Sequence, residues 1–233
     1  MNLEQPNLFQ ESVKEKTEEI KPDVNAQPAF SHNDIPFLPG LNGQEAFPDI
    51  SDYAKLENLG KNCSACRLRS TCGQVVFGSG NLKSPLLIIG EGPGQDEDIQ
   101  GIPFVGRAGQ LLDKILQAAE IERRQIYITN VVKCRPPGNR LPNPDEVKMC
   151  GRFLEAQIRL IKPEIIVCLG SLASQTVISP KVKITQMRGQ WLSRQGCRII
   201  ATFHPAALLR NPSYKRPVWE DFKSIRDVYK SIA

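Results

Sequence analysis

Apolar residues gather in four short runs in the later part of the chain. The runs "PLLIIG", "IYITNVV", "EIIVCLG" and "RIIATFHP" occupy residues 85–90, 126–132, 164–170 and 198–205. Each run is apolar almost without interruption, which is typical of parallel strands buried on both faces. The pattern therefore predicts four parallel strands in one sheet.

Amphipathic segments lie between and after these runs. Residues 111–119 and 147–161 carry apolar side chains at helical spacing, and a last helix is predicted from about Val218. The second segment has a clear start, with Asn143 as N-cap, Pro144 in the first turn and Glu146 completing a capping box. Strands that alternate with helices predict an open α/β sheet covered on both faces.

The most unusual residues follow the ends of the predicted strands, which read "GEGPG", "TN", "LGS" and "FHP". Ligands of open α/β folds bind beyond the carboxyl ends of the strands, so Asn130 and His204 are expected beside the loop of residues 90–94. This loop does not match G-x-G-x-x-G, and it lacks the Lys-Ser/Thr pair of a P-loop. A nucleotide-dependent enzyme is therefore disfavoured.

Charge is unevenly distributed. The 233 residues carry a formal net charge of +5, but residues 1–60 hold four Lys/Arg against eleven Asp/Glu and six of the 18 prolines. We interpret residues 1–55 as a mostly disordered acidic extension and residues 56–233 as one domain, and we expect a chain that starts near Leu56 to keep full activity. The basic remainder is suited to a polyanion such as nucleic acid, although a solvated basic surface has the same composition.

The cysteines point to a metal site. No apolar stretch approaches the roughly 20 residues of a membrane span and no signal peptide is evident, so a reducing, cytoplasmic location is expected. Cys63-x2-Cys66 and the pair Cys134 and Cys150 supply four thiolates that can converge on one site. Zinc, an iron–sulfur cluster and simple burial all remain compatible with this spacing. The three remaining cysteines, Cys72, Cys168 and Cys197, are not assigned to this site.

Three motifs, in this order and spacing, carry a resemblance to a known family: "GEGPGQDEDIQGIPFVGRAGQLLDKIL", "YITNVVKCRPPGNRLPNPDE" and "FHPAALLRNP". The sequence resembles the family 4 uracil-DNA glycosylases, the iron–sulfur type of bacteria and archaea, from about Cys63 to the C-terminus. The resemblance implies a three-layer αβα sandwich with a four-stranded parallel sheet. It also implies a 4Fe–4S cluster, whose ligands map onto Cys63, Cys66, Cys134 and Cys150.

The same resemblance assigns roles in reading the base. The enzyme would flip uracil out of the DNA stack into a pocket. Phe104 matches the ring that stacks on the base, and Asn130 matches the amide that pairs with O4 and N3–H. The backbone around Glu91 and Gly92 would supply hydrogen bonds at the O2 side. Cytosine presents the opposite donor and acceptor pattern to Asn130 and would be rejected.

Further matches concern bond cleavage. His204 matches the histidine that stabilises charge developing on O2. The family 1 motif "GQDPYH" has an Asp that positions water, but Gly92 stands at that place here. Glu97 is therefore the candidate to orient water, to block the C5 methyl of thymine, or both. Asn139 matches a position that supports the site.

The segment after His204 is expected to meet DNA. Leu208 or Leu209 would wedge into the gap left by the flipped base, and Arg210 would contact a phosphate. Further backbone contacts are expected from basic residues elsewhere: Lys133, Arg135, Arg140, Arg188 and Arg194.

These matches predict a monomeric, nucleoid-associated enzyme that excises uracil from single- or double-stranded DNA and leaves an abasic site. The extension would contact a replication or repair protein. One alternative is a relative that crosslinks to uracil-DNA, which is disfavoured because "GRAGQLLDKIL" lacks the Arg-rich insertion of that subgroup. A second alternative is a non-catalytic, metal-stabilised DNA-binding module.

Overall fold

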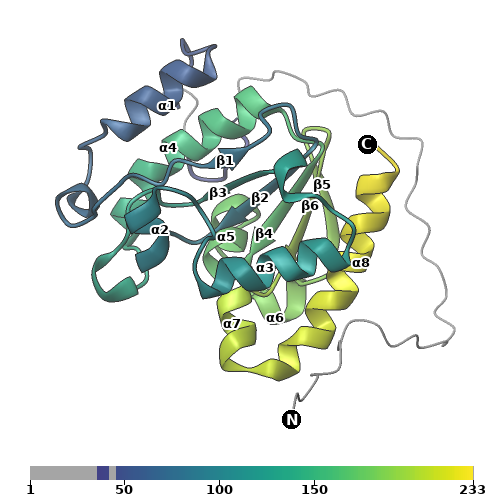
Figure 1. Cartoon of the computed structure of the whole chain (residues 1–233). Helices are drawn as coiled ribbons and strands as arrows, with labels where there is room; N and C mark the ends of the chain where they lie inside the picture. The colour runs from purple at the N-terminus through teal and green to yellow at the C-terminus, as the bar shows by residue number, and fades with distance from the viewer. Residues whose placement is uncertain (1–35, 42–45, 233) are drawn as a thin grey trace, which may run out of the picture.

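The computed structural model describes residues 36–41 and 46–232, and its centre is one six-stranded sheet (Figure 1). The strands are β1 Ser79–Gly80, β2 Leu86–Gly90, β3 Tyr127–Asn130, β4 Ile165–Leu169, β5 Trp191–Arg194 and β6 Cys197–Thr202. Their order is β1-β3-β2-β4-β6-β5, in which the four central strands are parallel and both edge strands are antiparallel. The four predicted parallel strands are therefore confirmed.

The two edge strands extend the sheet beyond the prediction. β1 is only two residues long, so it has no readable periodicity. β5 is partly exposed along its length and lacks the continuous apolar run of a central strand. A tight turn joins β5 to β6. Its two residues, Gln195 and Gly196, both have positive φ, as expected of a two-residue hairpin loop.

Helices cover both faces of the sheet and give three layers. They are α1 Tyr53–Lys61, α2 Gln95–Gln100, α3 Arg107–Ala118, α4 Pro144–Ile161, α5 Gly170–Val177, α6 Ile184–Met187, α7 Pro205–Arg210 and α8 Lys215–Lys230. Apolar residues of α3, α7 and α8 pack on one face, and those of α4 and α5 pack on the other. Figure 1 shows α3 and α8 on one side of the strands and α1 with α4 on the other. The αβα sandwich is confirmed. No helix within the described residues is long and apolar enough to cross a membrane.

Residues ahead of position 56 pack against the body. Phe37 and Leu38 are 3% and 2% exposed and belong to the core cluster on the α4 face. Their backbone N–H groups donate to the two carboxylate oxygens of buried Glu155, each at 2.7 Å. Phe47 stacks on Phe153 with ring centroids 4.8 Å apart. We therefore propose that the folded unit begins near residue 36, earlier than the boundary expected from composition. The proposed disorder of residues 1–35 lies outside the described residues.

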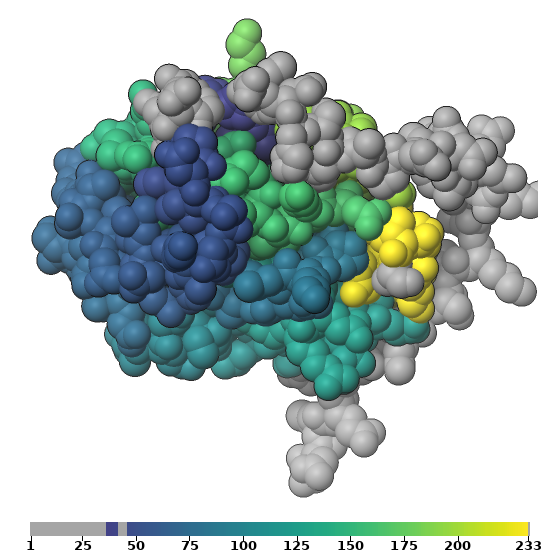
Figure 2. All heavy atoms as spheres, turned by 90° about the horizontal axis from the view of Figure 1, so that it is seen from above, coloured from purple at the N-terminus to yellow at the C-terminus, as the bar shows by residue number. Residues whose placement is uncertain are grey.

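Helix α1 spans the predicted domain boundary between residues 55 and 56. It begins after Asp52, whose side chain accepts a hydrogen bond from the Ala54 N–H group and caps the helix. Figure 2 shows α1, in dark blue, against the green surface of α4, on which it packs. Tyr53 lies inside this contact, where Gln157 donates to its hydroxyl group at 2.9 Å. The segment before position 56 thus contributes to both the apolar and the polar contacts of α4.

Candidate active site

A cavity of about 320 Å³ opens beyond the carboxyl ends of β2, β3 and β6. Its walls include residues from all three strand ends and from the loops that follow them: Glu91, Gly92, Pro93, Gly94, Glu97, Phe104, Ala108, Asn130, Pro136, Asn139, Arg140, Pro142, His204, Ala206 and Arg210. The structure therefore brings the predicted base-reading and catalytic residues together around one space.

Asn130 ends β3 and lies in the cavity wall. The residue is 1% exposed, and its side-chain Oδ1 is buried without a hydrogen-bond partner among the residues that the structure describes. Gly90, the neighbouring residue of β2, makes room for it: a Cβ there would lie 2.3 Å from Asn130 Oδ1 and 2.5 Å from the Phe104 ring. A buried acceptor left unpaired is costly, so this atom is suited to a donor supplied by a ligand.

Phe104 is held beside Asn130 in an unusual backbone conformation. Its φ of 54° lies in the left-handed region, which non-glycine residues rarely adopt and which is common at functional sites. Gly109 of α3 permits this position, because a Cβ there would lie 2.0 Å from the Phe104 carbonyl. The ring is 5.4 Å from the His204 ring, centroid to centroid, at an angle of 31°. These two rings and Asn130 form an apolar slot with polar groups along its edge.

Glu97 of α2 maintains this arrangement. One carboxylate oxygen accepts hydrogen bonds from the Val105 and Gly106 N–H groups at 2.9 and 2.8 Å, and the other accepts from Gly94 N–H at 3.1 Å. One oxygen is thus engaged with the backbone that follows Phe104, and the other with the residue that precedes α2. This geometry favours a positioning role for Glu97 over the predicted role of orienting water.

His204 faces the same space from the start of α7. Its Nδ1 accepts a hydrogen bond from Ala206 N–H at 3.1 Å, so the neutral ring carries its proton on Nε2. Burial, with a smaller contribution from the Arg210 guanidinium and against the opposing effect of Glu97, lowers the pKa of His204 to about 4. At neutral pH the residue is therefore an uncharged hydrogen-bond donor.

The charged edge of the cavity consists of Glu91 and Arg210. Burial raises the pKa of the Glu91 carboxyl group, and the nearby Arg210 opposes this shift. On α7, Leu208 is 1% exposed and belongs to the apolar core, whereas Leu209 is 42% exposed. The prediction that either leucine forms a wedge is therefore narrowed to Leu209, because Leu208 would have to leave the core.

The loop after β3 supplies the opposite wall. Asn139 accepts a hydrogen bond from Arg135 Nε at 2.8 Å within this loop, and its role at the site stays a prediction. Arg140 forms a two-pronged ion pair with the fully buried Glu146 carboxylate, at 2.7 and 2.8 Å. The Arg140 hydrogen bonds lower the pKa of Glu146 to about 2. Arg140 therefore serves to fix the cavity wall, a role that sequence reasoning did not assign to it.

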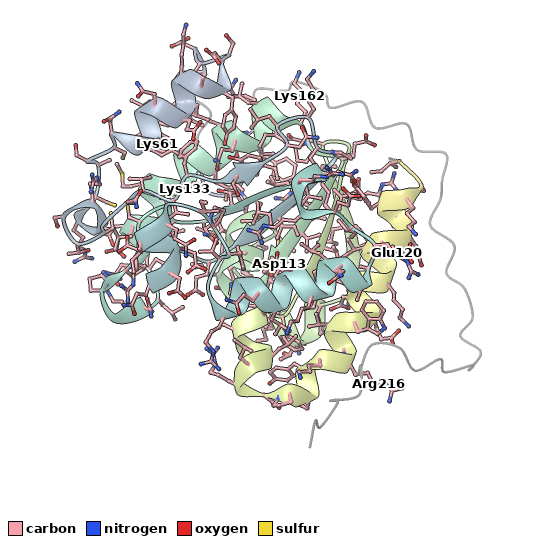
Figure 3. All side chains as sticks on the ribbon, in the orientation of Figure 1. Lys61, Asp113, Glu120, Lys133, Lys162 and Arg216 are labelled. Carbon is pink, nitrogen blue, oxygen red and sulfur yellow. The ribbon has the colours of Figure 1, made fainter. Side chains whose placement is uncertain are left out.

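Three of the predicted phosphate contacts are bonded to groups of the protein itself. Lys133 is 2% exposed, and its Nζ donates to Thr129 Oγ1, Asn130 O and Gln157 Oε1, each at 2.6 Å. Figure 3 shows Lys133 in the interior, whereas Lys162 and Arg216 lie at the periphery. Lys133 thus supports the Asn130 backbone from behind the cavity.

The other two of these cations are arginines on the side of the sheet formed by β5 and β6. Arg188 pairs with buried Asp221, with its Nε 3.1 Å from Asp221 Oδ2. Arg194 donates to the carbonyl oxygens of three residues, including Phe37 at 2.9 Å. The prediction for Lys133 is wrong because its side chain is buried, whereas DNA contacts by Arg188 and Arg194, which are partly exposed, stay predictions.

The four predicted cysteine ligands line one small cavity of about 20 Å³. Cys150 Sγ accepts a hydrogen bond from the Lys133 N–H group at 3.2 Å, and Cys63 Sγ accepts one from Ala65 N–H at 3.4 Å. Burial raises the pKa of the Cys150 thiol to about 11. Within residues 36–41 and 46–232, no three His, Cys, Asp or Glu side chains are gathered closely enough to hold a single metal ion.

Comparison with known proteins identifies the family. The family model for the uracil DNA glycosylase superfamily matches residues 77–223. The chain belongs to this superfamily. A type-4 uracil-DNA glycosylase of Thermotoga maritima is 49% identical over 176 residues, which cover 73% of this chain and 91% of that protein. A type-4 uracil-DNA glycosylase of Archaeoglobus fulgidus is 41% identical over 175 residues, which cover 72% and 88%. The resemblance to family 4 is confirmed.

Several wall residues of this superfamily member were not predicted to line its cavity. Pro136 and Pro142 bracket the loop after β3, and Ala108 and Ala206 lie in the first turns of α3 and α7. Their positions beside predicted residues are the only sequence signal that could have indicated them. Small or rigid side chains at these places keep the slot open without adding chemistry of their own.

Proposed function

We propose that the protein excises uracil from DNA by hydrolysing the bond between the base and the sugar. The proposal is carried by the buried Oδ1 of Asn130, which has no hydrogen-bond partner within the described residues and lies in the wall of the cavity that Phe104 and His204 also line. A flat base with an N–H donor at its edge can donate a hydrogen bond to Asn130 Oδ1 while one face of the base stacks on the Phe104 ring. The similarity to proteins named type-4 uracil-DNA glycosylases supports uracil as that base.

Recognition follows from the pattern of donors and acceptors. Asn130 Oδ1 accepts from uracil N3–H, and the side-chain amide N–H donates to O4. Cytosine carries an acceptor at N3 and a donor at N4, so it opposes Asn130 at both positions. Each reversed contact leaves buried polar groups unpaired and costs about 1 to 3 kcal/mol. The hydrogen bond from Lys133 Nζ to the Asn130 carbonyl oxygen holds the backbone of Asn130 in place.

Cleavage requires stabilisation of a uracil anion as the bond to the sugar lengthens. The neutral His204 ring donates its Nε2 proton in a hydrogen bond to the O2 atom, where negative charge develops. Arg210 adds a positive charge at the cavity edge, and burial of the slot strengthens both interactions. Water then completes the hydrolysis at the sugar.

A direct assay tests this proposal. The full chain is incubated with a single-stranded oligonucleotide that contains one uracil and then treated with alkali, which cleaves at abasic sites. We expect one cleavage product from the uracil strand and none from the matched strands with cytosine or thymine. An intact uracil strand after binding is demonstrated by gel shift would instead indicate a non-catalytic DNA-binding module.

The lowered pKa of His204 predicts an unusual pH profile. A histidine with its ordinary pKa of about 6.5 would lose the neutral form below that pH. Because the pKa of His204 is about 4, the neutral form persists, and the single-turnover rate on saturating DNA should stay level from pH 8 to 5.5 and fall only as the pH approaches 4. An acidic limb centred near pH 6.5 that disappears in His204→Asn would contradict this assignment.

We also propose that Cys63, Cys66, Cys134 and Cys150, which line the cysteine cavity, hold a 4Fe–4S cluster. The thiols share one cavity without being gathered around a single ion, and thiolates at four corners are the usual ligands of such a cluster. The N–H groups of Lys133 and Ala65 already point at two of the sulfurs. When bound, the cluster would crosslink segments far apart in the sequence, and nothing in the proposed reaction requires it to transfer electrons.

This assignment predicts coloured protein. Anaerobically purified full-length protein should be brown, with broad visible absorption that dithionite bleaches and about four irons per chain by metal analysis. Cys150→Ala should lose most of the colour and much of the soluble yield, because the loop after β3 loses an anchor. Replacement of Cys197, which begins β6 and does not line the cysteine cavity, should keep the colour. Stoichiometric zinc without colour would refute the cluster.

A further inference from the structure

An exposed leucine stands at the mouth of the cavity on the side away from Leu209. Leu141 is 67% exposed, and it lies between Arg140 and Pro142, both of which line the cavity. Its own side chain is not part of the cavity wall. Single exposed apolar side chains are common on protein surfaces, so what distinguishes Leu141 is its place between two residues that line the ligand cavity.

The topology sets Leu141 and Leu209 on opposite sides of the opening. The Leu141 loop follows β3 and α7 follows β6, and the sheet order puts β2 and β4 between those two strands. Three strand spacings of about 4.8 Å separate the points where the two segments leave the sheet. The slot that receives the base lies between them, above the end of β2.

The backbone of Leu141 is firmly held. Arg140 Nη1 donates to the Leu141 carbonyl oxygen at 2.9 Å, and the same guanidinium group forms an ion pair with the Glu146 carboxylate. Asn143 N–H donates to Glu146 Oε2 at 2.7 Å, and Pro142 restricts the chain between them. A rigid support of this kind suits a side chain that must enter a base stack without losing much conformational freedom on binding.

We propose that Leu141 is a second apolar contact to duplex DNA, which packs against the bases beside the flipped nucleotide on the side opposite to Leu209. Together the two leucines would hold the stack open from both sides, as apolar wedges do in proteins that kink DNA. The inference rests on the proposed function, since it requires a flipped base in the slot. It predicts a role that matters for duplex substrates, in which a vacated stack has to be kept open.

The test compares Leu141→Ala with Leu82→Ala on matched oligonucleotides. Leu82 is a suitable control because it is also an exposed leucine, at 42%, but lies in the turn before β2, at the other end of the sheet from the cavity. Single-turnover excision is measured on uracil in duplex and in single-stranded DNA. Fluorescence of 2-aminopurine next to the uracil reports unstacking independently of cleavage.

We expect Leu141→Ala to slow excision from duplex DNA by about tenfold, since alanine lacks most of the apolar area that leucine would bury. The single-strand rate should change less than about threefold, and the 2-aminopurine signal should fall. Leu82→Ala should match the parent on both substrates. Equal losses on both substrates, or no loss on either, would overturn the inference. A parent protein that releases no uracil at all would instead refute the proposed function.

Discussion

Asn130→Asp should slow uracil release by roughly ten- to several-hundred-fold and shift the base preference toward cytosine. The substitution replaces the amide donor to O4 with an acceptor and adds a buried charge. A reversed hydrogen bond in a dry pocket costs about 1 to 3 kcal/mol, and buried charge increases the cost. Cytosine offers a donor at the O4 position, so its relative acceptance should rise. Single-turnover rates on uracil and cytosine in matched single strands give both quantities.

Two controls separate base reading from damage to the fold. Affinity for a uracil-free duplex should be unchanged in Asn130→Asp, because the side chain lies inside the cavity. Asn139→Asp makes the same chemical change at an exposed position of the cavity rim and should leave the uracil-to-cytosine ratio intact. If Asn130→Asp slows uracil release less than tenfold, or leaves the preference unaltered, another group reads the base.

A chain that begins at Leu56 should fail to fold stably, contrary to the expectation from composition. It lacks Phe37 and Leu38, whose burial contributes about 1.5 to 3 kcal/mol each. It also lacks the two N–H groups bound to the Glu155 carboxylate, and such charged hydrogen bonds contribute about 1.5 to 3 kcal/mol each. The sum approaches the whole stability of an ordinary domain. Thermal melting and soluble yield measure the loss.

A chain that begins at Ile35 is the matched truncation, because it removes most of the acidic residues and keeps the packed segment. It should melt close to the full-length protein and retain excision. Leu38→Ala in the full chain tests the same contact without truncation, and it should cost about 2 to 5 kcal/mol of unfolding free energy. Equal melting temperatures for the two truncated chains would show that residues 36–55 add little to the fold.

The central strands and the site could be predicted because their signals are local. A parallel strand buried on both faces is a continuous apolar run, and each of the four runs became a central strand. Strand ends then determine which loops meet, so Asn130, His204 and the loop after β2 were expected together. Phe104 reached the same cavity from a loop that packs closely on Gly109 of α3, where a side chain would clash with the Phe104 carbonyl group.

Features that depend on distant partners could not be predicted in this way. Lys133 reads as a surface cation, yet Thr129, the Asn130 carbonyl and Gln157 surround its ammonium group. Gln157 lies 24 residues away, on another element. Likewise, composition marks residues 36–55 as extension, because a few apolar side chains in a polar segment carry no periodicity. Their burial depends on Glu155 and Phe153 of α4.

The acidic turn of α2 has an electrostatic consequence for the approach of a polyanion. Glu97 and Asp98 lie close to the mouth of a cavity that we propose receives DNA, where free carboxylates would repel phosphates. Glu97 instead accepts hydrogen bonds from three peptide N–H groups and Asp98 Oδ1 from two, and these five groups belong to three separate segments. A charge solvated by fixed dipoles projects a weaker field than its formal value, and salt screens the remainder within about 10 Å. Glu97 and Asp98, which order the loops, therefore oppose the capture of DNA less than their formal charges imply, and Arg210 supplies a positive charge at the mouth.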